Sequence, residues 1–443
     1  MSLYLAQAGY RVNLFERRSD LRKVTQSAGR SINLALSARG LHALEEVGLK
    51  DAVMQQALPM RGRMMHDPAG QLTFQPYGVH AHEAIYSISR GFLNEVLMDA
   101  AEASERVSIH FEQRCLGIDL DSGIVQMQDL PGGKHYSLSG NPVIGADGAG
   151  SALRQSLISR LRVNYAQDYL DHGYKELTLS PNAQGGFQLD PEALHIWPRQ
   201  RFMLIALPNP DASFTCTLFL PFESDADTPG FDQLSSPAAI SAFFETHFGD
   251  LPPLMPDLVA QFEQNPTGVL STIRLGPWYH GDRLLLLGDA AHAIVPFFGQ
   301  GMNAAFEDCS LLAARLRGQP ADLASVFVDF YRARKPDADA IADMALENFI
   351  EMRDKVADPA FLLRRQVGLL LAQRYPDIFV PKYSLVSFHR VSYALALAHG
   401  NLQQQLLLTL CEGLQRPEDL NWQQAEALVQ QFRREAPALN LSH

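Results

Sequence analysis

Arg283-Leu-Leu-Leu-Leu-Gly-Asp-Ala-Ala-His-Ala-Ile-Val-Pro-Phe-Phe-Gly-Gln-Gly-Met-Asn303 is the segment on which the expected architecture of this 443-residue chain rests. Leu284 to Leu287 are four successive leucines, whereas a strand with one wet face would alternate apolar and polar side chains. We therefore expect a strand that is buried on both faces. Asp289 follows it, so its carboxylate is expected at the carboxyl end of a central strand, where open α/β sheets bind ligands.

A loop and a helix come next. Pro296, Gly299 and Gly301 close the loop, and apolar residues then recur on one stripe of a helix that ends near Gly318. The glycines leave the first amides of this helix uncovered, so a partly negative ligand atom can approach its positive end. A carboxylate beside bare amides suits a polyhydroxylated, electron-accepting cofactor. The plainer alternative is an acid that only caps the next turn, but the Pro-Phe-Phe-Gly-Gln-Gly continuation favours the cofactor.

Composition bounds the class of protein. The length allows two or three domains, and the apolar fraction of 47% is normal for a soluble globular protein. The net charge of −12 includes no basic run, which argues against nucleic acid and anionic membranes and favours a small-molecule partner. The four cysteines are far apart, and no uncharged apolar run approaches the ~18 residues of a membrane span. We expect reduced thiols, no bound metal, no membrane anchor and a cytoplasmic location.

The N-terminal region carries a second acid at the end of a strand. A helix end near Gly9 is followed by a strand from Arg11 to Glu16, and a Rossmann unit uses such an acid to hold the ribose of a dinucleotide. The glycine fingerprint belongs about 20 residues before that acid. Only fifteen residues precede Glu16. Three explanations stay open: Met1 is an internal methionine, the sequence is truncated, or the first strand and phosphate loop are lost.

Further along, Gly145-Ala-Asp-Gly148 repeats the pattern of a strand that ends in an acid. Ala28-Gly-Arg30 has the composition of a phosphate-binding turn, although an ordinary turn explains it better. Arg90 heads a helix and suits either a cofactor or a salt bridge.

Strand-like segments between 163 and 270 indicate a separate antiparallel sheet. Helices are expected after Tyr331, including residues 336–353 and 362–374.

Several motifs together resemble the FAD-dependent single-component aromatic hydroxylases: Glu16-Arg-Arg18, Gly145-Ala-Asp-Gly148, Gly288-Asp-Ala-Ala-His292 and Gly299-Gln-Gly-Met-Asn303. Within that family, longer segments closely resemble the kynurenine 3-monooxygenases: Gly29 to Gly40, Met60-Arg-Gly-Arg-Met64, Pro76-Tyr-Gly78, His195-Ile-Trp-Pro198, Val295 to Asn303, Met344 to Met352 and Val380-Pro-Lys-Tyr-Ser384. The resemblance extends over nearly the whole chain.

The resemblance implies an α/β fold, with a Rossmann-like FAD-binding domain that lacks its first strand and comprises residues 1–65, 84–162 and 271–330. An antiparallel substrate-domain sheet is expected over residues 66–83 and 163–270. A C-terminal helical region over residues 331–443 is expected to close the substrate pocket. The oligomeric state is left open.

The resemblance also implies the chemistry. FAD is the cofactor and NADPH a transient co-substrate. Oxygen adds to the reduced flavin, and the resulting C4a-hydroperoxide hydroxylates L-kynurenine at carbon 3, a step of tryptophan degradation. Because this chemistry belongs to the flavin, no catalytic residue is assigned.

The residues that match the family's sites fall into two groups. Arg63 is implied to grip the substrate carboxylate, with the hydroxyls of Tyr77 and Tyr383 and the amide of Asn348 beside it. Phe297 and Phe298 would line the ring and exclude water. The implied cofactor contacts are Glu16, Arg17, Arg18, Ala35, Arg90, Cys115, Asp289, Gly301, Met302 and Asn303. Without the resemblance, Tyr77 and Asn348 would more often be surface or capping residues. His195 and Trp197 are interpreted as packing, and His292 as structural.

Two alternatives remain at this point. The first is another FAD-dependent hydroxylase, acting on a phenol or a benzoate, whose activity would not need Arg63. The second is a non-catalytic, truncated homologue that no longer binds FAD. A flavin absorption band in the purified protein would exclude the second.

Overall fold

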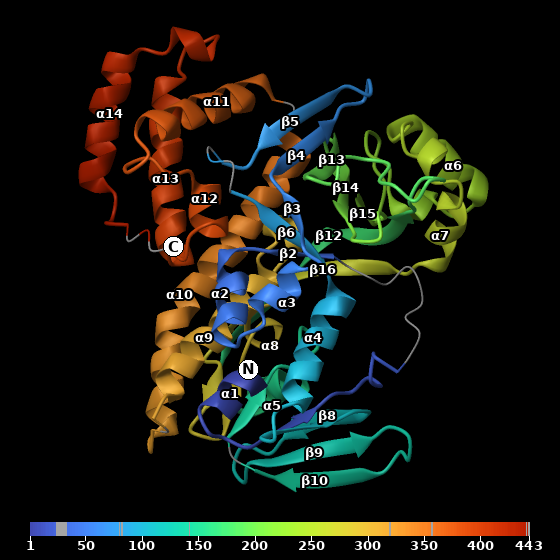
Figure 1. Cartoon of the computed structure of the whole chain (residues 1–443), viewed down its shortest axis with the longest axis vertical. Helices are drawn as coiled ribbons and strands as arrows, with labels where there is room; N and C mark the ends of the chain where they lie inside the picture. Colours follow the sequence, from blue (N-terminus) through green and yellow to red (C-terminus); the bar gives the residue numbers. More distant parts are fainter. Residues whose placement is uncertain are drawn as a thin grey trace. The chain divides into compact units, whose positions relative to one another are not determined.

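The computed structural model describes residues 1–23, 33–78, 80, 83–140, 142–318, 320–355, 358–439 and 441 (Figure 1). The chain divides into two compact units. The first comprises Met1–Gln56, Ile88–Tyr169 and Ser271–Ala342, and the second comprises Ala57–Ser87, Leu170–Leu270 and Asp343–His443. Residues 57–65 and 343–443 thus belong to the second unit, whereas we expected the former in the FAD-binding domain and the latter in a separate helical region.

The first unit alternates short strands with helices. Its elements are α1 (Ser2–Gln7), β1 (Val12–Phe15), β2 (Asn33–Leu36), α2 (Ala38–Glu46), α3 (Lys50–Met54), α4 (Arg90–Glu102), β7 (Val107–His110), β8 (Gln113–Ile118), β9 (Ile124–Asp129), β10 (His135–Ser139), β11 (Val143–Gly145), α5 (Ala152–Arg160), β17 (Tyr279–His280), β18 (Leu284–Leu286), α8 (Asp289–His292), η3 (Pro296–Phe298) and α9 (Gly301–Leu316). Four elements pass from one unit to the other: β6 (Ile85–Ser89), β12 (Asn164–Leu179), β16 (Thr267–Gly276) and α10 (Leu323–Ile350).

Two parallel strand pairs carry the acids that the sequence places at strand ends. β1 runs parallel to β7, and β11 runs parallel to β18, with Val143 opposite Leu284. β17 lies on the other side of β18, so β18 is the middle strand of its sheet. In the part of the chain that the structure describes, no strand pairs with the second edge of β1 or of β11. The antiparallel strands β8, β9 and β10 form a meander, and residues 130–134 connect β9 to β10.

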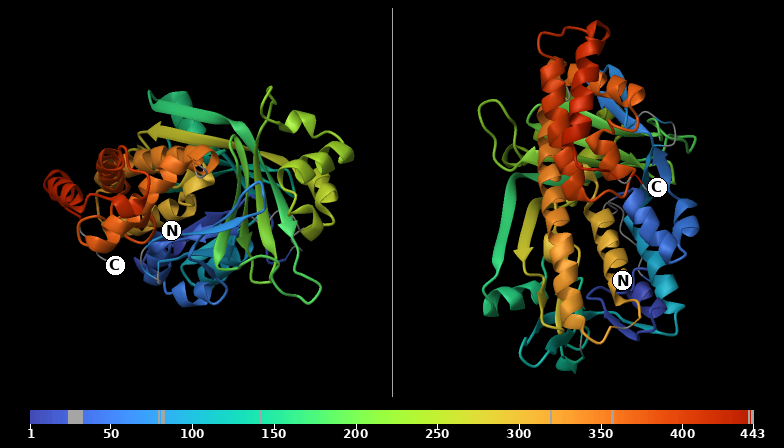
Figure 2. Two further views of the ribbon diagram at one scale, coloured as in Figure 1. Left: turned by 90° about the horizontal axis from the view of Figure 1, so that it is seen from above. Right: turned by 90° about the vertical axis from the view of Figure 1, so that its left-hand side faces the viewer.

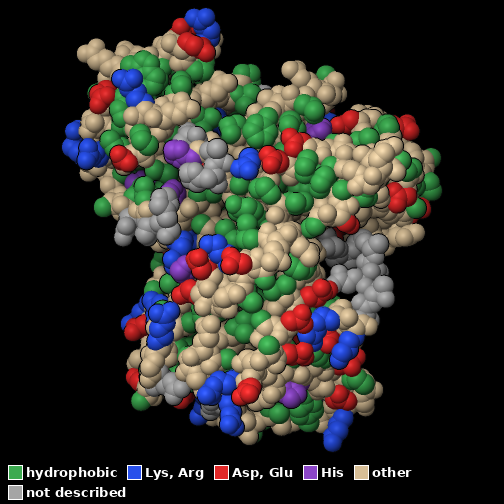
Figure 3. All heavy atoms as spheres, in the orientation of Figure 1, with side chains coloured by type: hydrophobic (Ala, Val, Ile, Leu, Met, Phe, Trp, Pro, Cys, Tyr) green, Lys and Arg blue, Asp and Glu red, His purple; other side chains and the backbone are tan. Residues whose placement is uncertain are grey.

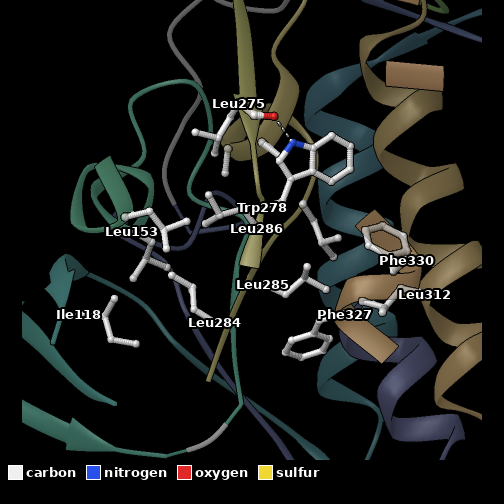
Figure 4. Packing of buried hydrophobic residues seen from close by; sticks show 14 of the residues in the cluster. Ile118, Leu153, Leu275, Trp278, Leu284, Leu285, Leu286, Leu312, Phe327 and Phe330 are labelled. Carbon is white, nitrogen blue, oxygen red and sulfur yellow. Dashed lines mark hydrogen bonds between the residues drawn. The ribbon is translucent and has the colours of Figure 1, made fainter. Parts of the chain in front are cut away.

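The leucine strand lies inside the main core of the first unit (Figure 4). Leu284, Leu285 and Leu286 are completely buried, which confirms the expected strand with two buried faces. Trp278 packs beside them, and its indole Nε1 donates to the Leu275 carbonyl at 2.9 Å. Phe327 and Phe330 of α10 complete the cluster. Because this strand is so enclosed, the backbone at its carboxyl end has little freedom.

The second unit is built on a seven-stranded sheet in the order β16-β12-β15-β14-β13-β4-β5. Its elements are β3 (Leu58–Met60), β4 (Gly62–His66), β5 (Leu72–Pro76), β13 (Ala193–Arg199), β14 (Phe202–Pro208), β15 (Phe214–Pro221), η1 (Phe231–Gln233), α6 (Pro237–His247), η2 (Pro252–Leu254), α7 (Leu258–Gln264), a π-helical turn η4 (Glu351–Lys355), α11 (Pro359–Arg374), α12 (Lys382–Ser387), α13 (Tyr393–Leu410), η5 (Pro417–Asp419) and α14 (Trp422–Glu435). The pairings from β12 through β15 and β14 to β13, and that of β4 with β5, are antiparallel as expected, whereas β4 joins β13 in parallel.

Two further cores hold the second unit together. α6 and α7 pack phenylalanines, including Phe244 and Phe262, against Trp197 and other apolar side chains of the sheet. The C-terminal helices α11, α13 and α14 share a separate core with Leu406 and Val429, and α13 and α14 lie side by side in both views of Figure 2.

One expected helix starts much earlier than predicted. We expected a helix from Pro336 to Arg353, but α10 begins at Leu323 and contains Pro336 inside it. Proline is usually placed in the first turn because it lacks an N–H. Here burial of Phe327, Phe330 and Ile341 along one long helix outweighs the lost backbone bond.

None of the helices within the described ranges is both long enough and apolar enough to cross a membrane. On the face seen in Figure 3, basic and acidic side chains are interspersed.

Candidate active site

The turn after β18 depends on Gly288. Its φ of +56° lies in the left-handed region, which strongly favours glycine, and a Cβ at this position would also lie only 3.1 Å from the Cβ of Ala305. The Gly288 N–H donates to the buried carboxylate of Asp308 at 3.0 Å. The chain therefore leaves the strand in a defined direction.

Asp289 is the exposed residue that this turn presents, at the start of α8. Its carboxylate lies in the first turn of α8, directly after the N-cap residue Gly288. Within the described ranges, no hydrogen bond or ion pair to this carboxylate is present. The plainer interpretation of an acid that only caps the next turn is therefore wrong, and the group is available for hydroxyl groups of a ligand.

The start of α9 is bare, as the glycines indicate. Gly299 adopts a left-handed conformation with φ of +66°, and no side chain caps the first turn of this sixteen-residue helix. Gly301 and Met302 are half-buried. Their N–H groups and the positive end of the helix dipole can stabilise an electron-rich atom such as a cofactor carbonyl oxygen.

Asn303 has a structural side chain. Its Oδ1 accepts from the N–H of Ser37 at 2.9 Å, and its Nδ2 donates to the carbonyls of Ala35 at 2.8 Å and Gly299 at 2.9 Å. These bonds hold Ala35 beside the loop before α9. Since the side chain is fully used, only the backbone amide of Asn303 can serve a cofactor.

The acid after β1 lies on a cavity of about 310 Å³ in the first unit. Glu16 and Arg18 line this cavity, and Arg17 is exposed beside them. The Glu16 carboxylate accepts the N–H of Arg18 at 2.8 Å, which orients it. Most of the wall is apolar and comes from α1, α2, α4, α9, β1 and β7 and from the residues directly after α2 and β7: Leu3, Tyr4, Leu14, Ala43, Leu44, Val47, Leu97, Met98, Ile109, Phe111 and Phe306. A flat apolar ring with a sugar beside the carboxylate suits this lining.

Arg90 and Cys115 are the other cofactor residues expected in this unit. Arg90 is exposed at the start of α4, and no ion pair within the described ranges involves its guanidinium. The half-buried Cys115 lies opposite Met127 in the ladder of β8 and β9. Burial raises the pKa of the Cys115 thiol to about 11, so the thiol is neutral and only its backbone is expected to contact a cofactor.

Two other candidate motifs have different outcomes. Asp147 accepts the Ser151 hydroxyl at 2.6 Å and the Leu153 N–H at 3.2 Å, so it caps α5. Ala28-Gly-Arg30 lies outside the described residues.

In the second unit, β4 and β5 place two of the expected substrate residues on one face. Arg63 lies opposite Gln75 in this antiparallel pair, and Tyr77 follows two residues later, with its N–H bonded to the Arg61 carbonyl at 3.0 Å. Because side chains alternate along a strand, Arg63, Gln75 and Tyr77 point to the same side. Arg63 and Tyr77 are both buried.

The remaining two expected residues complete the cluster around Arg63. Its guanidinium carbon is 5.8 Å from the ring centre of Tyr77 and 5.4 Å from that of Tyr383 in α12, and the two rings stack at 4.8 Å. Asn348 of α10 accepts from Arg63 Nη2 at 3.5 Å. The carboxylate of Glu351 lies 3.5 Å from Arg63 Nη1. Tyr77, Tyr383 and Asn348, the other substrate residues expected in this unit, thus all surround the guanidinium of Arg63.

This cluster contains polar atoms without partners. Arg63 Nε and the Tyr77 hydroxyl are buried, and neither meets hydrogen-bond geometry with a described residue, although the Tyr77 hydroxyl lies near enough to Arg63 and Tyr383 to influence the pKa of both. Burial raises the pKa of the Tyr77 phenol, so the phenol remains a donor. For Arg63, burial is the largest single influence and lowers the pKa, but Glu351, Tyr77 and Tyr383 together outweigh it and raise the pKa overall. A buried donor left unpaired is costly, so the arrangement fits a planar anionic ligand such as a carboxylate.

Sequence reasoning missed two charged residues next to this cluster. Glu351 is in the quoted segment and lies one helical turn after Asn348, which is the signal that could have identified it. Arg365 of α11 donates to the side chain of Gln75 and, at 2.9 Å, to the Pro76 carbonyl. Burial and the nearby Arg63 lower the pKa of Arg365 to about 10. No sequence spacing indicates Arg365, because 288 residues separate it from Tyr77.

The other expected residues are buried. Phe297 and Phe298 belong to the first unit, in the turn directly before Gly299. His195 and Trp197 are buried in the sheet of the second unit, and the Trp197 indole donates to Asp250 at 2.7 Å. His292 is buried against Asp308 at 2.6 Å, in agreement with a structural role.

Comparisons with known proteins agree with this geometry. The sequence model of the FAD binding domain family matches residues 1–232 and 255–327. Among solved structures, 2-methyl-3-hydroxypyridine-5-carboxylic acid oxygenase has a TM-score of 0.64 at 20% identity and covers 82% of this chain and 91% of its own. Klebsiella pneumoniae HpxO, complexed with FAD and uric acid, has a TM-score of 0.61 at 19% identity over 80% of this chain and 86% of its own. At these identities the structures show the fold alone, and they confirm the expected FAD-binding architecture.

Relatives in sequence are much more similar. The kynurenine 3-monooxygenase of Myxococcus xanthus (strain DK1622) is 50% identical over 97% of this chain and 92% of its own length. That of Stenotrophomonas maltophilia (strain K279a) is 43% identical over 100% of this chain and 96% of its own. The chain therefore belongs to the kynurenine 3-monooxygenase family of FAD-dependent monooxygenases.

Proposed function

We propose that the protein hydroxylates L-kynurenine at carbon 3 with NADPH and O2, as a step of tryptophan degradation. The names of relatives at 43% and 50% identity support this substrate. The observation that carries the proposal is the buried guanidinium of Arg63, whose Nε and neighbouring Tyr77 hydroxyl have no hydrogen-bond partner in the described ranges. An amino-acid carboxylate supplies the acceptors that both groups need.

In this proposal the second unit recognises the amino-acid end of the substrate. Arg63 gives a charge-assisted pair of bonds to the carboxylate, while the hydroxyls of Tyr77 and Tyr383 and the amide of Asn348 add further bonds. Glu351 lies 3.5 Å from Arg63 and partly balances the buried charge. A phenol or a simple benzoate has no amino-acid group and would leave some of these donors unpaired.

The first unit would hold FAD. Asp289 would accept from hydroxyls of the ribityl chain, and the amides of Gly301, Met302 and Asn303 would face the flavin carbonyls. Glu16, Arg17 and Arg18 would hold the adenosine end at the cavity, and Ala35, Arg90 and the backbone of Cys115 would add contacts. The Asp289 carboxylate, which is exposed and has no partner among the described residues, and the uncapped start of α9 fit such a group. When bound, FAD takes a hydride from NADPH and uses O2 to deliver one oxygen atom to the substrate ring.

The protein's own contribution is orientation and the exclusion of water. Phe297 and Phe298 are buried apolar rings directly before Gly299, and they would keep water from the reacting ring. No side chain is needed as a general base, because the aniline nitrogen of kynurenine activates its own ring. A cytoplasmic location belongs to the same proposal, in keeping with four unpaired cysteines, and cell fractionation would test it.

NADPH oxidation by the FAD-loaded protein tests the proposal. We expect L-kynurenine to stimulate the rate at 340 nm, and 3-hydroxykynurenine with one atom of ¹⁸O from ¹⁸O2 to appear in the mass spectrum. Stimulation by a phenol or benzoate but not by kynurenine would support the alternative hydroxylase and overturn the proposal. A protein that shows no flavin band after incubation with FAD would overturn it in favour of a non-catalytic homologue.

Two arginine variants test whether Arg63 binds the substrate carboxylate. Arg63→Ala should lower kcat/KM for L-kynurenine at least 100-fold, mainly through KM, because it removes a buried, charge-assisted pair of bonds worth about 3 kcal/mol. Arg61→Ala is the control, since Arg61 lies two residues away with a 43% exposed side chain and an ion pair to Glu192. Equal effects of the two substitutions would contradict the assignment of Arg63.

A further inference from the structure

Asp308 of α9 is a completely buried carboxylate whose role the proposed function does not explain. Its Oδ2 accepts two bonds, from the Gly288 N–H at 3.0 Å and from His292 Nε2 at 2.6 Å. Its Oδ1 accepts from Arg334 Nε of α10 at 2.6 Å. Burial alone would raise the pKa of Asp308, but His292 and Arg334 outweigh it and lower the pKa to about 2, so the group is ionised.

Arg334 connects this carboxylate to a larger buried network. Its Nη1 lies 2.7 Å from Glu307 and 3.3 Å from Asp337, and its Nη2 donates to the Ala304 carbonyl at 3.1 Å. Glu307 in turn lies 3.1 Å from Nε of Arg39 in α2. The contacts of Arg334, Glu307 and Arg39 bind helices to one another. The contacts of Asp308 to Gly288 and His292 differ, because they reach both ends of the five-residue Gly288–His292 turn that contains Asp289.

That turn needs an external anchor. The Asp289 carboxylate is exposed and has no bond of its own in the described ranges, so the backbone alone sets its position. Gly288 before it has a φ of +56°. Glycine can adopt this φ, but it can adopt many other values equally well, so the residue type alone does not hold the turn in this conformation. The amides of Ala291 and His292 return to the Gly288 carbonyl at 2.8 and 2.9 Å. The N–H of Gly288 is bonded to Asp308 and its carbonyl to the amides of Ala291 and His292, so both backbone groups of Gly288 are held.

We infer that Asp308, together with His292, is a positioning residue for the flavin cofactor: it fixes the Gly288–His292 turn so that Asp289 is held in place before its ligand arrives. The inference rests on the proposed binding of FAD at Asp289. A carboxylate that is already oriented binds hydroxyl groups without a further loss of conformational freedom. Asp308 acts only through Asp289 and touches no cofactor atom.

FAD affinity of the apoprotein, measured by quenching of flavin fluorescence and by the visible flavin spectrum, tests this role. Asp308→Asn should raise the Kd for FAD about tenfold or more, because it weakens charge-assisted bonds that hold the turn. Glu307→Gln is the matched control: it is the neighbouring buried carboxylate, contacts the same Arg334, and has no contact with the turn. It should lower the melting temperature but change the Kd less than threefold.

A double-mutant cycle separates positioning from general stability. If Asp308 acts through Asp289, the Asp289→Asn/Asp308→Asn protein should bind FAD as weakly as Asp289→Asn alone. His292→Gln provides a second route if Asp308→Asn does not fold, since it removes the 2.6 Å bond but leaves Arg334 in place. It should weaken FAD binding in the same direction.

The possible outcomes are distinct. Additive effects of the two aspartate substitutions, or an unchanged Kd in both Asp308→Asn and His292→Gln, would overturn the inference and leave the proposed function intact. A wild-type protein that takes up no FAD would overturn the proposed function and the inference with it.

Discussion

The hydroxyl of Tyr77 is a buried donor with no hydrogen-bond partner within the described ranges. Its removal is therefore expected to stabilise the apoprotein but to weaken substrate binding. Tyr77→Phe removes a polar atom whose desolvation costs about 1–3 kcal/mol without a bond. We therefore expect the free energy of unfolding of the apoprotein to rise by about 1 kcal/mol, measured by urea denaturation. The KM for L-kynurenine should rise about tenfold in the same variant, because the carboxylate loses a donor.

Tyr136→Phe is the control for this substitution. The Tyr136 hydroxyl donates to Gln113 Oε1 at 2.6 Å, in the meander of the first unit. Its loss should lower stability slightly and leave KM unchanged. A Tyr77→Phe protein that is less stable than the wild type and has an unchanged KM would show that the hydroxyl serves the fold and not a ligand.

Residues near one another in sequence were the ones that could be predicted. Asp289 was placed correctly because four leucines and a glycine precede it, and β18 has both faces buried. Arg63, Tyr77, Asn348 and Tyr383 were named only through the family resemblance. Arg365 was missed because its closeness to Tyr77 depends on how α11 packs on β5, which no local pattern encodes.

At the scale of elements, β4 and β13 share a buried polar chain that makes the second unit sensitive to acid. Asp250 Oδ2 bonds His66 Nδ1 at 3.0 Å, His66 Nε2 bonds His195 Nδ1 at 2.8 Å, and His195 Nε2 bonds the Asp190 carbonyl at 2.9 Å. His66 also stacks on Trp197 at 3.8 Å. The sequence indicates only that His195 and Trp197 pack, because their partners are distant in sequence: His66 lies in β4, and Asp190 and Asp250 lie in separate loops.

Burial lowers the pKa of His195 to about 4 from its ordinary value of 6.5. The unfolded chain therefore takes up the proton first as the pH falls. The stability from a neutral His195 is fully present above pH 6.5, declines between pH 6.5 and about 4, and amounts to about 3 kcal/mol. Urea unfolding across this window should show the decline, and His195→Gln should reduce its slope. His110→Gln, on the exposed surface of β7, is the control. An identical slope in wild type and His195→Gln would contradict this account.

Helix boundaries show why element-level expectations were less accurate than residue-level ones. Pro336 marked a helix start by its local preference, yet α10 begins thirteen residues earlier. The apolar faces before and after Pro336 are buried in the same helix, so tertiary packing outweighs a single missing backbone bond. Expectations based on extended apolar runs, such as the leucine strand, are less often overturned by tertiary packing, because the apolar side chains of the run are themselves the groups that pack.

For the whole molecule, the residues expected to bind the cofactor and those expected to bind the substrate carboxylate belong to different units. The cofactor residues lie in Met1–Gln56, Ile88–Tyr169 and Ser271–Ala342, while Arg63, Tyr77, Asn348 and Tyr383 lie in the second unit. A ligand that binds the folded state stabilises the elements that it contacts. Each ligand should therefore protect its own set of backbone amides from hydrogen exchange.

Hydrogen exchange followed by mass spectrometry measures this directly. FAD added to the apoprotein should slow exchange in peptides that cover residues 283–303 and 12–18. L-kynurenine added to the apoprotein should slow exchange in peptides that cover residues 61–78 and 380–388, because in the proposed site its carboxylate would bridge Arg63 to Tyr77 and Tyr383. The amine that lacks this carboxylate but keeps the same ring is the matched control and should give no protection there. Protection by L-kynurenine confined to residues 295–300 would contradict the assignment, since the ring would then bind without the guanidinium.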